Sequence, residues 1–491
     1  MRLGDLLARA GLPTGGAGEV SVTGFAIDHR KVAPGTVFGA FQGAAFNGED
    51  FIPAAIAAGA VAVVARPEAG VQGALHIADT NPRRAFALLA AGFFAPVPET
   101  IVAVTGTNGK TSCVEMTRQI WRMAGERAAS IGTLGVTTPD GSVSTGLTTP
   151  DIVTFLANMS GLAREGVTHV AFEASSHGLS QYRNEGLRVA ASAFTNFSRD
   201  HLDYHGTMEE YFAAKMRLFT EVAAPGSPAV IHDAGDGSEW TAKAMAQAEA
   251  RGLNVLTVGE GGRFLKLIAR EPGQLGQLLQ IEHEGQIRKV NLPLIGAYQA
   301  ANALVSAGLA LATGVAASTV FDAITRLQPV RGRLERAALN AAGAPAYVDY
   351  AHTPDALEAA IAALRPHVAP GGRLIVVFGA GGDRDTGKRP QMGKVAARAA
   401  DIAIVTDDNP RSEDPATIRA AIMAGAGANT RDIGDRRAAI AAAIGEARAQ
   451  DIVLIAGKGH EQGQIFGSGE HMRIEAFDDV EVARQCAGGQ C

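Results

Sequence analysis

The stretch Ile101-Val102-Ala103-Val104-Thr105-Gly106-Thr107-Asn108-Gly109-Lys110-Thr111 decides the fold of this 491-residue chain. An apolar run, a glycine-containing turn and an amphipathic pattern predict a strand, a loop and a helix in succession. Consecutive backbone N–H groups in such a loop, with the N-terminus of the helix behind them, make a cradle for a phosphate. In this cradle Lys110 would neutralise β- and γ-phosphate oxygens and Thr111 would bind Mg²⁺. We therefore predict an α/β protein that binds a nucleotide.

The loop departs from the general phosphate-loop pattern at one position, where Val104 stands in place of a glycine, so we interpret it as a shortened variant. The alternative is a glycine-rich turn with an exposed lysine, and the context of strand, loop and helix argues against it. In the helix that follows, Cys113, Met116 and Ile120 recur at helical spacing. This spacing predicts that Cys113 is a buried apolar side chain and not a nucleophile.

Length and shifts in composition predict three domains. One shift lies at residues 95–99, where Pro96 and Pro98 close an alanine-rich segment, and the other lies at residues 328–333. We expect a small N-terminal α/β domain over residues 1–98, a central phosphate-loop ATPase domain with a mostly parallel sheet over residues 99–329, and a C-terminal Rossmann-like domain over residues 330–491.

The charge balance, the cysteines and the apolar runs exclude several classes of protein. The 44 Lys and Arg residues against 50 Asp and Glu residues give a net charge of −6, which argues against a nucleic-acid partner. Three cysteines are too few for a disulfide framework in a chain of this size. The N-terminus lacks the apolar run of a signal peptide, and the longest apolar stretch, residues 51–65, is too short to span a bilayer. We expect a cytoplasmic protein without membrane insertion.

The third segment carries the clearest pattern of alternating strands and helices. We expect strands at residues 346–350, 374–378, 402–405 and 452–455, with helical patterns such as residues 355–368 and 436–450 between them. This alternation predicts a parallel sheet. Polar residues follow each strand, at Asp349 and His352, at Asp383 and Arg384, at 407–411 and at 458–461. Because ligands bind outside the carboxyl ends of such strands, we expect these loops to form one site.

The other two segments are also α/β in pattern. In the first we expect strands at residues 24–28, 37–41 and 61–65, and in the middle segment at 169–172, 191–194 and 229–232. Residues 264–294 alternate in shorter periods and predict an antiparallel excursion at the sheet edge. An apolar run ends at Glu173, which would place a metal-binding carboxylate beside the phosphate cradle, and residues 199–206 gather ionisable side chains after another strand.

The chain resembles the Mur ligase family in several motifs, which occur in the order of the family and extend over nearly the whole chain. These motifs lie at residues 105–111, 173–178, 200–205, 213–215, 332–335 and 349–355. The resemblance implies an ATP-dependent amide ligase with three domains, which bind a UDP-linked substrate, ATP and an amino acid respectively. We expect a monomer. It also implies that the γ-phosphate of ATP is transferred to a substrate carboxylate and that an amine displaces it from the acyl phosphate.

The family pattern assigns Lys110, Glu173, His201 and Lys215 to catalysis. It implies that Thr111 and Glu173 bind one Mg²⁺, that Glu173 and His201 bind a second, and that Lys215 is carbamylated by CO₂ and so becomes a metal ligand. The local sequence by itself indicates a surface lysine at position 215 on an amphipathic helix.

The resemblance also implies the residues that contact the two nucleotide substrates. Those expected to bind ATP are Gly106, Thr107, Asn108, Gly109, Lys110, Thr111, Asn302, Arg333, Asp349 and His352. Those expected to bind UDP-N-acetylmuramoyl-L-alanyl-D-glutamate are Ile27, His29, Thr148, Thr149, Ser175, Gln181 and Arg183. His29 stands where the family often has a serine, and Gln299 stands where it has an asparagine.

The incoming amino acid is indicated by Asp408-Asn409-Pro410-Arg411, the pattern of the family members that add meso-diaminopimelate. Diaminopimelate differs from lysine by one carboxylate, for which a guanidinium is the natural bidentate partner. Arg411 and Arg384 would supply guanidinium groups, and Glu461, which follows Gly457, would accept from the far ammonium. The expected site therefore comprises Arg384, Asp408, Asn409, Pro410, Arg411, Gly457 and Glu461.

Two alternatives stay open at this point. A lysine-adding, alanyl-alanine-adding or folylpolyglutamate-type ligase would share the ATP motifs. A nucleotide-driven regulatory or transport ATPase would hydrolyse ATP without an acceptor carboxylate, but it leaves the polar loops of the third segment unexplained.

Overall fold

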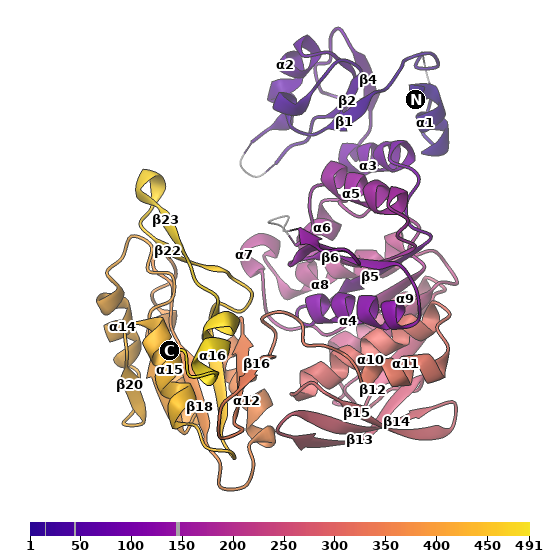
Figure 1. Cartoon of the computed structure of the whole chain (residues 1–491). Coiled ribbons are helices and arrows are strands. Elements are labelled where there is room, and N and C mark those ends of the chain that lie inside the picture. Colours follow the sequence, from indigo (N-terminus) through magenta and orange to yellow (C-terminus); the bar gives the residue numbers. More distant parts are fainter. Residues whose placement is uncertain (15, 44–45, 144–147) are drawn as a thin grey trace. The chain divides into compact units, whose positions relative to one another are not determined.

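The computed structural model describes the whole chain except residues 15, 44–45 and 144–147. The backbone divides into two compact units, one of residues 1–264 with 305–320 and one of residues 265–304 with 321–491. Helices α10 (Ala297–Ala312) and α11 (Ala317–Ile324) contribute residues to both units. Figure 1 shows both units, with many of their elements labelled.

The first unit begins with a parallel sheet of order β1-β2-β3-β4. Alternate residues of its strands face opposite cores: Val37 and Val64 pack with α1 and α3, whereas Phe38 and Val63 pack with α2. The three expected strands are confirmed, and β4 is an addition. The elements are α1 (Leu3–Arg9), β1 (Gly24–Ala26), β2 (Thr36–Gly39), α2 (Ile52–Ala57), β3 (Ala60–Ala65), β4 (Leu75–Ala78) and α3 (Pro82–Phe93).

The larger sheet of the first unit has the order β12-β11-β10-β5-β9-β6-β7-β8. It is parallel from β12 to β6, whereas β7 pairs antiparallel with both β6 and β8. Its strands are β5 (Thr100–Thr105), β6 (Ala128–Gly132), β7 (Gly135–Thr137), β8 (Ser142–Val143), β9 (His169–Glu173), β10 (Ala191–Phe194), β11 (Pro228–His232) and β12 (Asn254–Gly259). The strand β5 therefore lies inside the sheet, so the loop that follows it emerges between the ends of β9 and β10.

The helices of this sheet are α4 (Lys110–Met123), α5 (Ile152–Arg164), α6 (Ser176–Ser180), α7 (Leu202–His205), α8 (Met208–Arg217) and α9 (Glu239–Ala250). The predicted inward face of α4 is confirmed, because Cys113, Met116 and Ile120 are fully buried. Burial also raises the pKa of the Cys113 thiol, which removes it as a nucleophile at neutral pH.

The second unit contains a sheet of order β16-β17-β21-β18-β19-β20, in which only β16 is antiparallel. Val376 and Phe378 pack with α12, α13 and α14 on one face, and Ile375 and Val377 pack with α15 and α16 on the other. This two-sided covering explains the continuous apolar runs of the strands. The bounds are β16 (Glu335–Leu339), β17 (Pro345–Asp349), α12 (Pro354–Leu364), β18 (Leu374–Phe378), α13 (Lys388–Ala399), β19 (Ile402–Val405), α14 (Pro415–Met423), β20 (Thr430–Asp432), α15 (Arg436–Glu446), β21 (Ile452–Ala456) and α16 (Asp479–Ala487).

Two antiparallel pieces complete the second unit. The strands β13 (Leu265–Gly273), β14 (Gly276–His283) and β15 (Gln286–Leu292) confirm that residues 264–294 are antiparallel. The hairpin β22 (Gly463–Phe466) and β23 (Arg473–Ala476) was not expected from the sequence.

The C-terminal end carries a disulfide between Cys486 and Cys491. It joins residues five positions apart and so closes one terminal turn, not a framework. Among the described residues, no helix is both long enough and apolar enough to cross a membrane.

Candidate active site

The loop after β5 has the backbone conformation that its glycines permit. Gly106 has φ 139°, and a Cβ added there would collide with the side-chain oxygen of Thr195. Gly109 has φ 87° and begins α4 in the left-handed region. The loop is tied to the end of β10, since the N–H groups of Thr107 and Asn108 both donate to Asn196, each at 2.9 Å. The phosphate loop is therefore fixed by its own neighbours.

Lys110 folds back over the loop, and its Nζ donates to the carbonyl oxygens of Gly106 at 2.9 Å and Thr107 at 2.8 Å. Thr111 lies at the start of α4 and is 7% exposed. The helix N-terminus, the ammonium and a hydroxyl thus lie together, which is the set that a nucleotide phosphate with its metal requires.

Lys215 is buried, with 1% of its surface exposed, so the local reading of a surface lysine is wrong. Its Nζ donates to the carbonyl oxygen of Gly106 at 2.7 Å and lies 4.4 Å from the ring centre of Tyr211. Burial, with a smaller contribution from the Lys110 ammonium, lowers the pKa of Lys215 to about 6. The helical pattern could not show this, because the phosphate loop that covers Lys215 comes from a distant segment.

Glu173 ends β9, where the sheet register pairs it with Val104, two residues before Gly106. Its carboxylate is 2% exposed and accepts from the backbone N–H of Thr133 at 2.7 Å and from the Thr133 hydroxyl at 3.3 Å. Gly132 makes room for it, since a Cβ there would collide with Glu173 Oε1. The carboxylate is thus held at the end of the strand next to the phosphate loop.

His201 lies in a cluster of rings that reaches Lys215. It has φ 49°, and its ring centre lies 5.0 Å from that of His177 and 6.0 Å from that of Tyr211. The Tyr211 hydroxyl donates to Thr107 Oγ1 at 3.3 Å, which links the cluster to the phosphate loop. Burial first, and then the neighbouring histidines and Lys215, lower the pKa of His205 to about 4. Sequence reasoning missed His177, His205 and Tyr211 as members of the site.

Five of the residues expected to bind the UDP-linked substrate belong to one hydrogen-bond network. Thr149 Oγ1 lies 2.9 Å from Ser175 Oγ and donates to the carbonyl oxygen of Glu173 at 2.9 Å. Arg183 donates to the carbonyl oxygen of Thr149 and to Gln181 Oε1, both at 2.7 Å. Thr148 joins the network through its hydroxyl, 3.1 Å from that of Thr133. The network therefore extends to the buried carboxylate of Glu173.

A pocket in the first unit brings together residues from loops and helices that are far apart in the sequence. It is lined by Ile27, Phe41, Arg83, Asp151, Ile152, Gln181 and Arg183. Three of these were expected, whereas Phe41, Arg83, Asp151 and Ile152 were missed. Arg83 donates to the carbonyl oxygen of Gln42 at 2.9 Å and covers the ring of Phe41. No local signal distinguishes it from Arg84, which pairs with Glu185 at 3.1 Å.

The predicted residue His29 begins a short 3-10 helix and stacks flat on Phe51, with ring centres 4.4 Å apart. Asn47 accepts from the N–H of Glu49 at 3.2 Å, as a turn residue does. Phe51 therefore covers one face of the His29 ring.

In the second unit, the polar loops follow the ends of β17, β18, β19 and β21, as expected. Asn409 Nδ2 donates to Glu461 Oε2 at 2.9 Å, and the half-buried Arg411 donates through Nη1 to the carbonyl oxygen of Gly382 at 2.9 Å. Arg384 Cγ and Arg411 Nη1 both lie near Gly381, at 3.9 Å and 2.7 Å from the position a Cβ would take. The loops after β18, β19 and β21 therefore meet, which places these candidate residues in one cluster.

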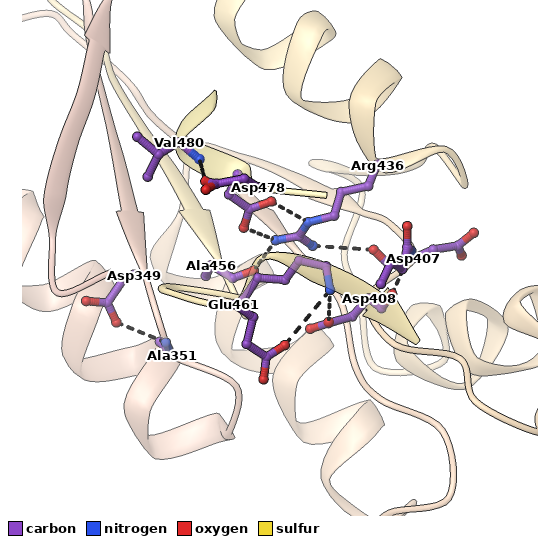
Figure 2. A network of polar contacts seen from close by, with 12 residues as sticks. Asp349, Ala351, Asp407, Asp408, Arg436, Ala456, Glu461, Asp478 and Val480 are labelled. Atoms are coloured by element: carbon purple, nitrogen blue, oxygen red, sulfur yellow. Dashed lines mark hydrogen bonds and ion pairs between the residues drawn. The ribbon is translucent and has the colours of Figure 1, made fainter. Parts of the chain in front are cut away.

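This cluster is supported from behind by a buried arginine that sequence reasoning missed. Arg436 is fully buried and pairs with Asp479 at 2.6 Å, while its guanidinium also donates to the carbonyl oxygens of Asp407 at 3.4 Å and Ala456 at 3.1 Å. Figure 2 shows Arg436 between Asp407 and Ala456, beside Asp408. The pair thus ties the ends of β19 and β21, which precede the two loops of the cluster.

The residues of the second unit that were expected to bind ATP lie around the loop after β17, which adjoins the cluster because the ring of Tyr350 lies 5.0 Å from that of His460 in the loop after β21. Asp349 accepts from the N–H groups of Leu334 at 2.8 Å and Ala351 at 3.0 Å (Figure 2 shows the second). Arg333 lies over the ring of Tyr350 at 5.4 Å, and its buried Nε has no hydrogen-bond partner within the described part of the chain. Gln299 donates to the carbonyl oxygen of Arg333 at 2.8 Å, and Asn302 donates to Gln299 at 3.4 Å. The side-chain amide of Gln299 therefore makes hydrogen bonds through both its nitrogen and its oxygen. The side chain of His352 is exposed.

These features define an α/β enzyme that uses a nucleotide. The phosphate loop has two lysines on one carbonyl oxygen and a buried carboxylate beside it, and a polar cluster lies at the end of a second, mostly parallel sheet. Three family models match: the Mur ligase family, catalytic domain over residues 21–93, the Mur ligase middle domain over 104–310 and the Mur ligase, glutamate ligase domain over 332–459. The chain belongs to the Mur ligase family and is an ATP-dependent ligase with three α/β domains.

Several ligases similar to this chain over nearly its whole length bear the same name. The chain is 59% identical over 467 residues to UDP-N-acetylmuramoyl-L-alanyl-D-glutamate--2,6-diaminopimelate ligase of Zymomonas mobilis, with 95% of both chains covered, and 52% identical to the ligase of that name from Bradyrhizobium diazoefficiens, with 98% covered. A solved structure of a ligase of that name matches with TM-score 0.74 and 33% identity over 96% of this chain and 95% of the other. A folylpolyglutamate synthase of Mycobacterium tuberculosis, at 19% identity over 77% of this chain and 92% of its own, with TM-score 0.58, shares the fold alone.

Proposed function

We propose that this enzyme adds meso-diaminopimelate to UDP-N-acetylmuramoyl-L-alanyl-D-glutamate at the expense of ATP, in the synthesis of peptidoglycan precursors. The observation that carries the choice of amino acid is the cluster of Asn409, Arg411 and Glu461, in which a guanidinium and a carboxylate lie in neighbouring loops. The relatives of 52% and 59% identity bear the name of this activity. The proposal includes a monomer in the cytoplasm.

The reaction needs two displacements. A carboxylate oxygen of the D-glutamate side chain forms a bond to the γ-phosphorus of ATP, the bond to ADP breaks, and an acyl phosphate results. The amine of diaminopimelate then attacks the acyl carbon, phosphate leaves with the oxygen, and the amine loses a proton. Negative charge gathers in the first step, so the Lys110 ammonium and the N-terminus of α4 have a direct role in stabilising it.

The residues present fit Mg²⁺, because hard oxygen donors lie beside the phosphate loop. Glu173 offers a carboxylate fixed by Thr133, and Thr111 offers a hydroxyl at the start of α4. Mg²⁺ is usually held by one or two carboxylates together with substrate phosphates. We assign Thr111 and Glu173 to one ion and Glu173 and His201 to a second. When bound, the ions would neutralise phosphate oxygens during transfer.

Lys215 fits carbamylation, because its amine is buried and its pKa is lowered to about 6. A neutral amine can attack CO₂: the nitrogen–carbon bond forms, the nitrogen loses a proton, and a carboxylate-like group replaces the ammonium. We assign this carbamate to the metal site. It would put negative charge beside the loop at the place where the Lys215 amine now donates to Gly106.

For the substrates, we assign the pocket of the first unit, together with Thr148, Thr149, Ser175 and His29, to the UDP-linked dipeptide. Two half-buried arginines, Arg83 and Arg183, line this pocket and suit an anionic substrate. The orphaned Nε of Arg333 supports a ligand near the group of Asn302, Asp349 and His352, which we assign to ATP.

Product analysis tests the proposal. Purified enzyme is incubated with ATP, Mg²⁺, the UDP-linked dipeptide and either meso-diaminopimelate or L-lysine, and the product is identified by mass spectrometry. We expect the diaminopimelate adduct with one phosphate released for each adduct. A lysine adduct formed equally well would contradict the choice of amino acid, and phosphate release without either amino acid or dipeptide would favour a regulatory ATPase.

A further inference from the structure

A buried lysine lies behind the diaminopimelate cluster. Lys458 follows β21 and is fully buried, so its ammonium does not reach a substrate directly. Its Nζ donates to Asn409 Oδ1 and to the carbonyl oxygen of Gly463, both at 2.8 Å. The carboxylates of Asp408 and Glu461 lie at 3.4 Å and 4.0 Å from it, and the lines drawn from both converge in Figure 2.

The ammonium determines which way the Asn409 amide points. Asn409 Oδ1 accepts from two donors, Lys458 Nζ and the backbone N–H of Ile465 at 3.0 Å. A flipped amide would turn its own N–H groups toward these donors and lose both bonds. Asn409 Nδ2 therefore faces Glu461, to which it donates at 2.9 Å. In this way Lys458 sets the position of a carboxylate that it barely contacts.

The same lysine connects the loop to the strand β22. Its bond to Gly463 adds to the bond from Gln464 Nε2 to the carbonyl oxygen of Asp408, at 2.6 Å. Further along β22, the N–H of Arg411 donates to the carbonyl oxygen of Ile465 at 3.0 Å, and the N–H of Gly467 donates to that of Arg411 at 2.7 Å. This pairing holds Arg411 at φ 53°, a conformation that non-glycine residues seldom adopt.

Burial of an ammonium costs free energy unless the group is paired and hydrogen-bonded. Removal of Lys458 would in turn leave its partners, Asn409 Oδ1 and the carboxylate of Asp408, without this donor. We propose that Lys458 is a positioning residue for the incoming amino acid, which fixes Asn409, Glu461 and the Arg411 loop for the far end of diaminopimelate. The inference rests on the proposed function and adds a residue that does not contact the substrate. It predicts a defect in amino-acid binding and selectivity, and not in ATP use.

The test compares Lys458→Met, which keeps the length of the side chain without its charge, with Lys394→Met, an exposed lysine of α13 in the same unit. Steady-state kinetics are measured for all three substrates. We expect the KM for meso-diaminopimelate to rise about 10- to 100-fold in Lys458→Met, as for loss of a charged hydrogen bond, with the KM for ATP unchanged. The preference for diaminopimelate over L-lysine should fall, and Lys394→Met should match the unaltered enzyme.

A second variant separates positioning from folding. In an Asn409→Ala background the amide is gone, so adding Lys458→Met should raise the KM for diaminopimelate much less than it does alone. If Lys458→Met does not fold, Lys458→Gln, which keeps a donor, takes its place. An unchanged KM for diaminopimelate, or equal rises for all three substrates, would overturn the inference. An unaltered enzyme that does not use diaminopimelate would instead overturn the proposed function.

Discussion

The Nζ atom of Lys215 donates to the carbonyl oxygen of Gly106 at 2.7 Å, the same oxygen that accepts from Lys110 at 2.9 Å. Two lysines thus converge on the residue that begins the phosphate loop. Lys215 is buried, which disfavours its charged form, whereas Lys110 lies where nucleotide phosphates bind. The two lysines therefore have different tasks: Lys110 offers positive charge, and Lys215 offers an amine.

Replacement of Lys215 tests the second task. The kcat of Lys215→Ala should fall at least about 100-fold, because the carbamate that we assign to the metal site is removed and the transition state loses its electrostatic stabilisation. Added acetate should restore part of the activity by supplying a small carboxylate in the space that the side chain leaves. Lys243→Ala, at a partly exposed lysine on α9, serves as the control. Full activity of Lys215→Ala, or failure of acetate to restore any, would refute the carbamate.

The pH dependence of carbamylation follows from the lowered pKa of Lys215. The group is neutral above its pKa, which is about 6 in the folded protein, and becomes protonated as the pH falls through that value. At a fixed pressure of isotope-labelled CO₂, incorporation should therefore be high at pH 7 to 8 and decline below about pH 6. The label is followed by carbon NMR. Incorporation that began only near the pH of an ordinary lysine would show that the amine is protonated at neutral pH.

Arg83 and Arg84 form a matched pair for testing the pocket. Arg83 lines the pocket, whereas Arg84 pairs with Glu185. Arg83→Ala should raise the KM for the UDP-linked dipeptide about 10-fold or more, since a charged contact is lost, and leave the KM for ATP unchanged. Arg84→Ala should have a smaller effect on both. The assignment fails if the two variants behave alike in a full kinetic analysis.

Arg411 is expected to recognise the second carboxylate of diaminopimelate. Arg411→Ala should lower kcat/KM for diaminopimelate about 100-fold, because a bidentate charged pair is lost. Affinity for ATP, measured by calorimetry, should stay within about twofold. A loss of ATP binding of the same size would show that the loop has a general structural role instead.

The buried pair of Arg436 and Asp479 should stabilise the second unit. Asp479→Asn leaves the Arg436 charge buried without its partner and should lower the free energy of unfolding by about 3–5 kcal/mol. Glu358→Gln, in an exposed pair with Arg398, should change it by less than about 1 kcal/mol. Urea denaturation followed by circular dichroism measures both. Equal effects would mean that burial of the pair adds nothing.

Much of the fold follows from local patterns, and much of the site does not. The predicted strands at residues 374–378 and 402–405 agree with the structure to the residue, because a continuous apolar run between polar loops is typical of a strand in a parallel sheet. The hairpin at Gly463–Ala476 was missed, since each of its strands has only four residues and β23 is exposed throughout.

Residues that act through distant partners were hidden from sequence reasoning. Lys215 resembles a surface lysine until the loop from residues 106–110 covers it, and Arg436 begins an ordinary alanine-rich helix until Asp479 closes over it. Glu173, by contrast, stood out because a carboxylate at the end of an apolar strand has few other uses. Motifs within one loop and the meeting of loops at one edge of a parallel sheet were therefore predictable, whereas the individual side-chain contacts between distant segments were not.

The central claim is tested most directly by the ratio of kcat/KM for meso-diaminopimelate to that for L-lysine, measured with saturating ATP and UDP-linked dipeptide. Lysine lacks the carboxylate that we assign to Arg411 and would leave the guanidinium without its partner. The account predicts a ratio of about 100 or more in favour of diaminopimelate. A ratio near one would contradict it.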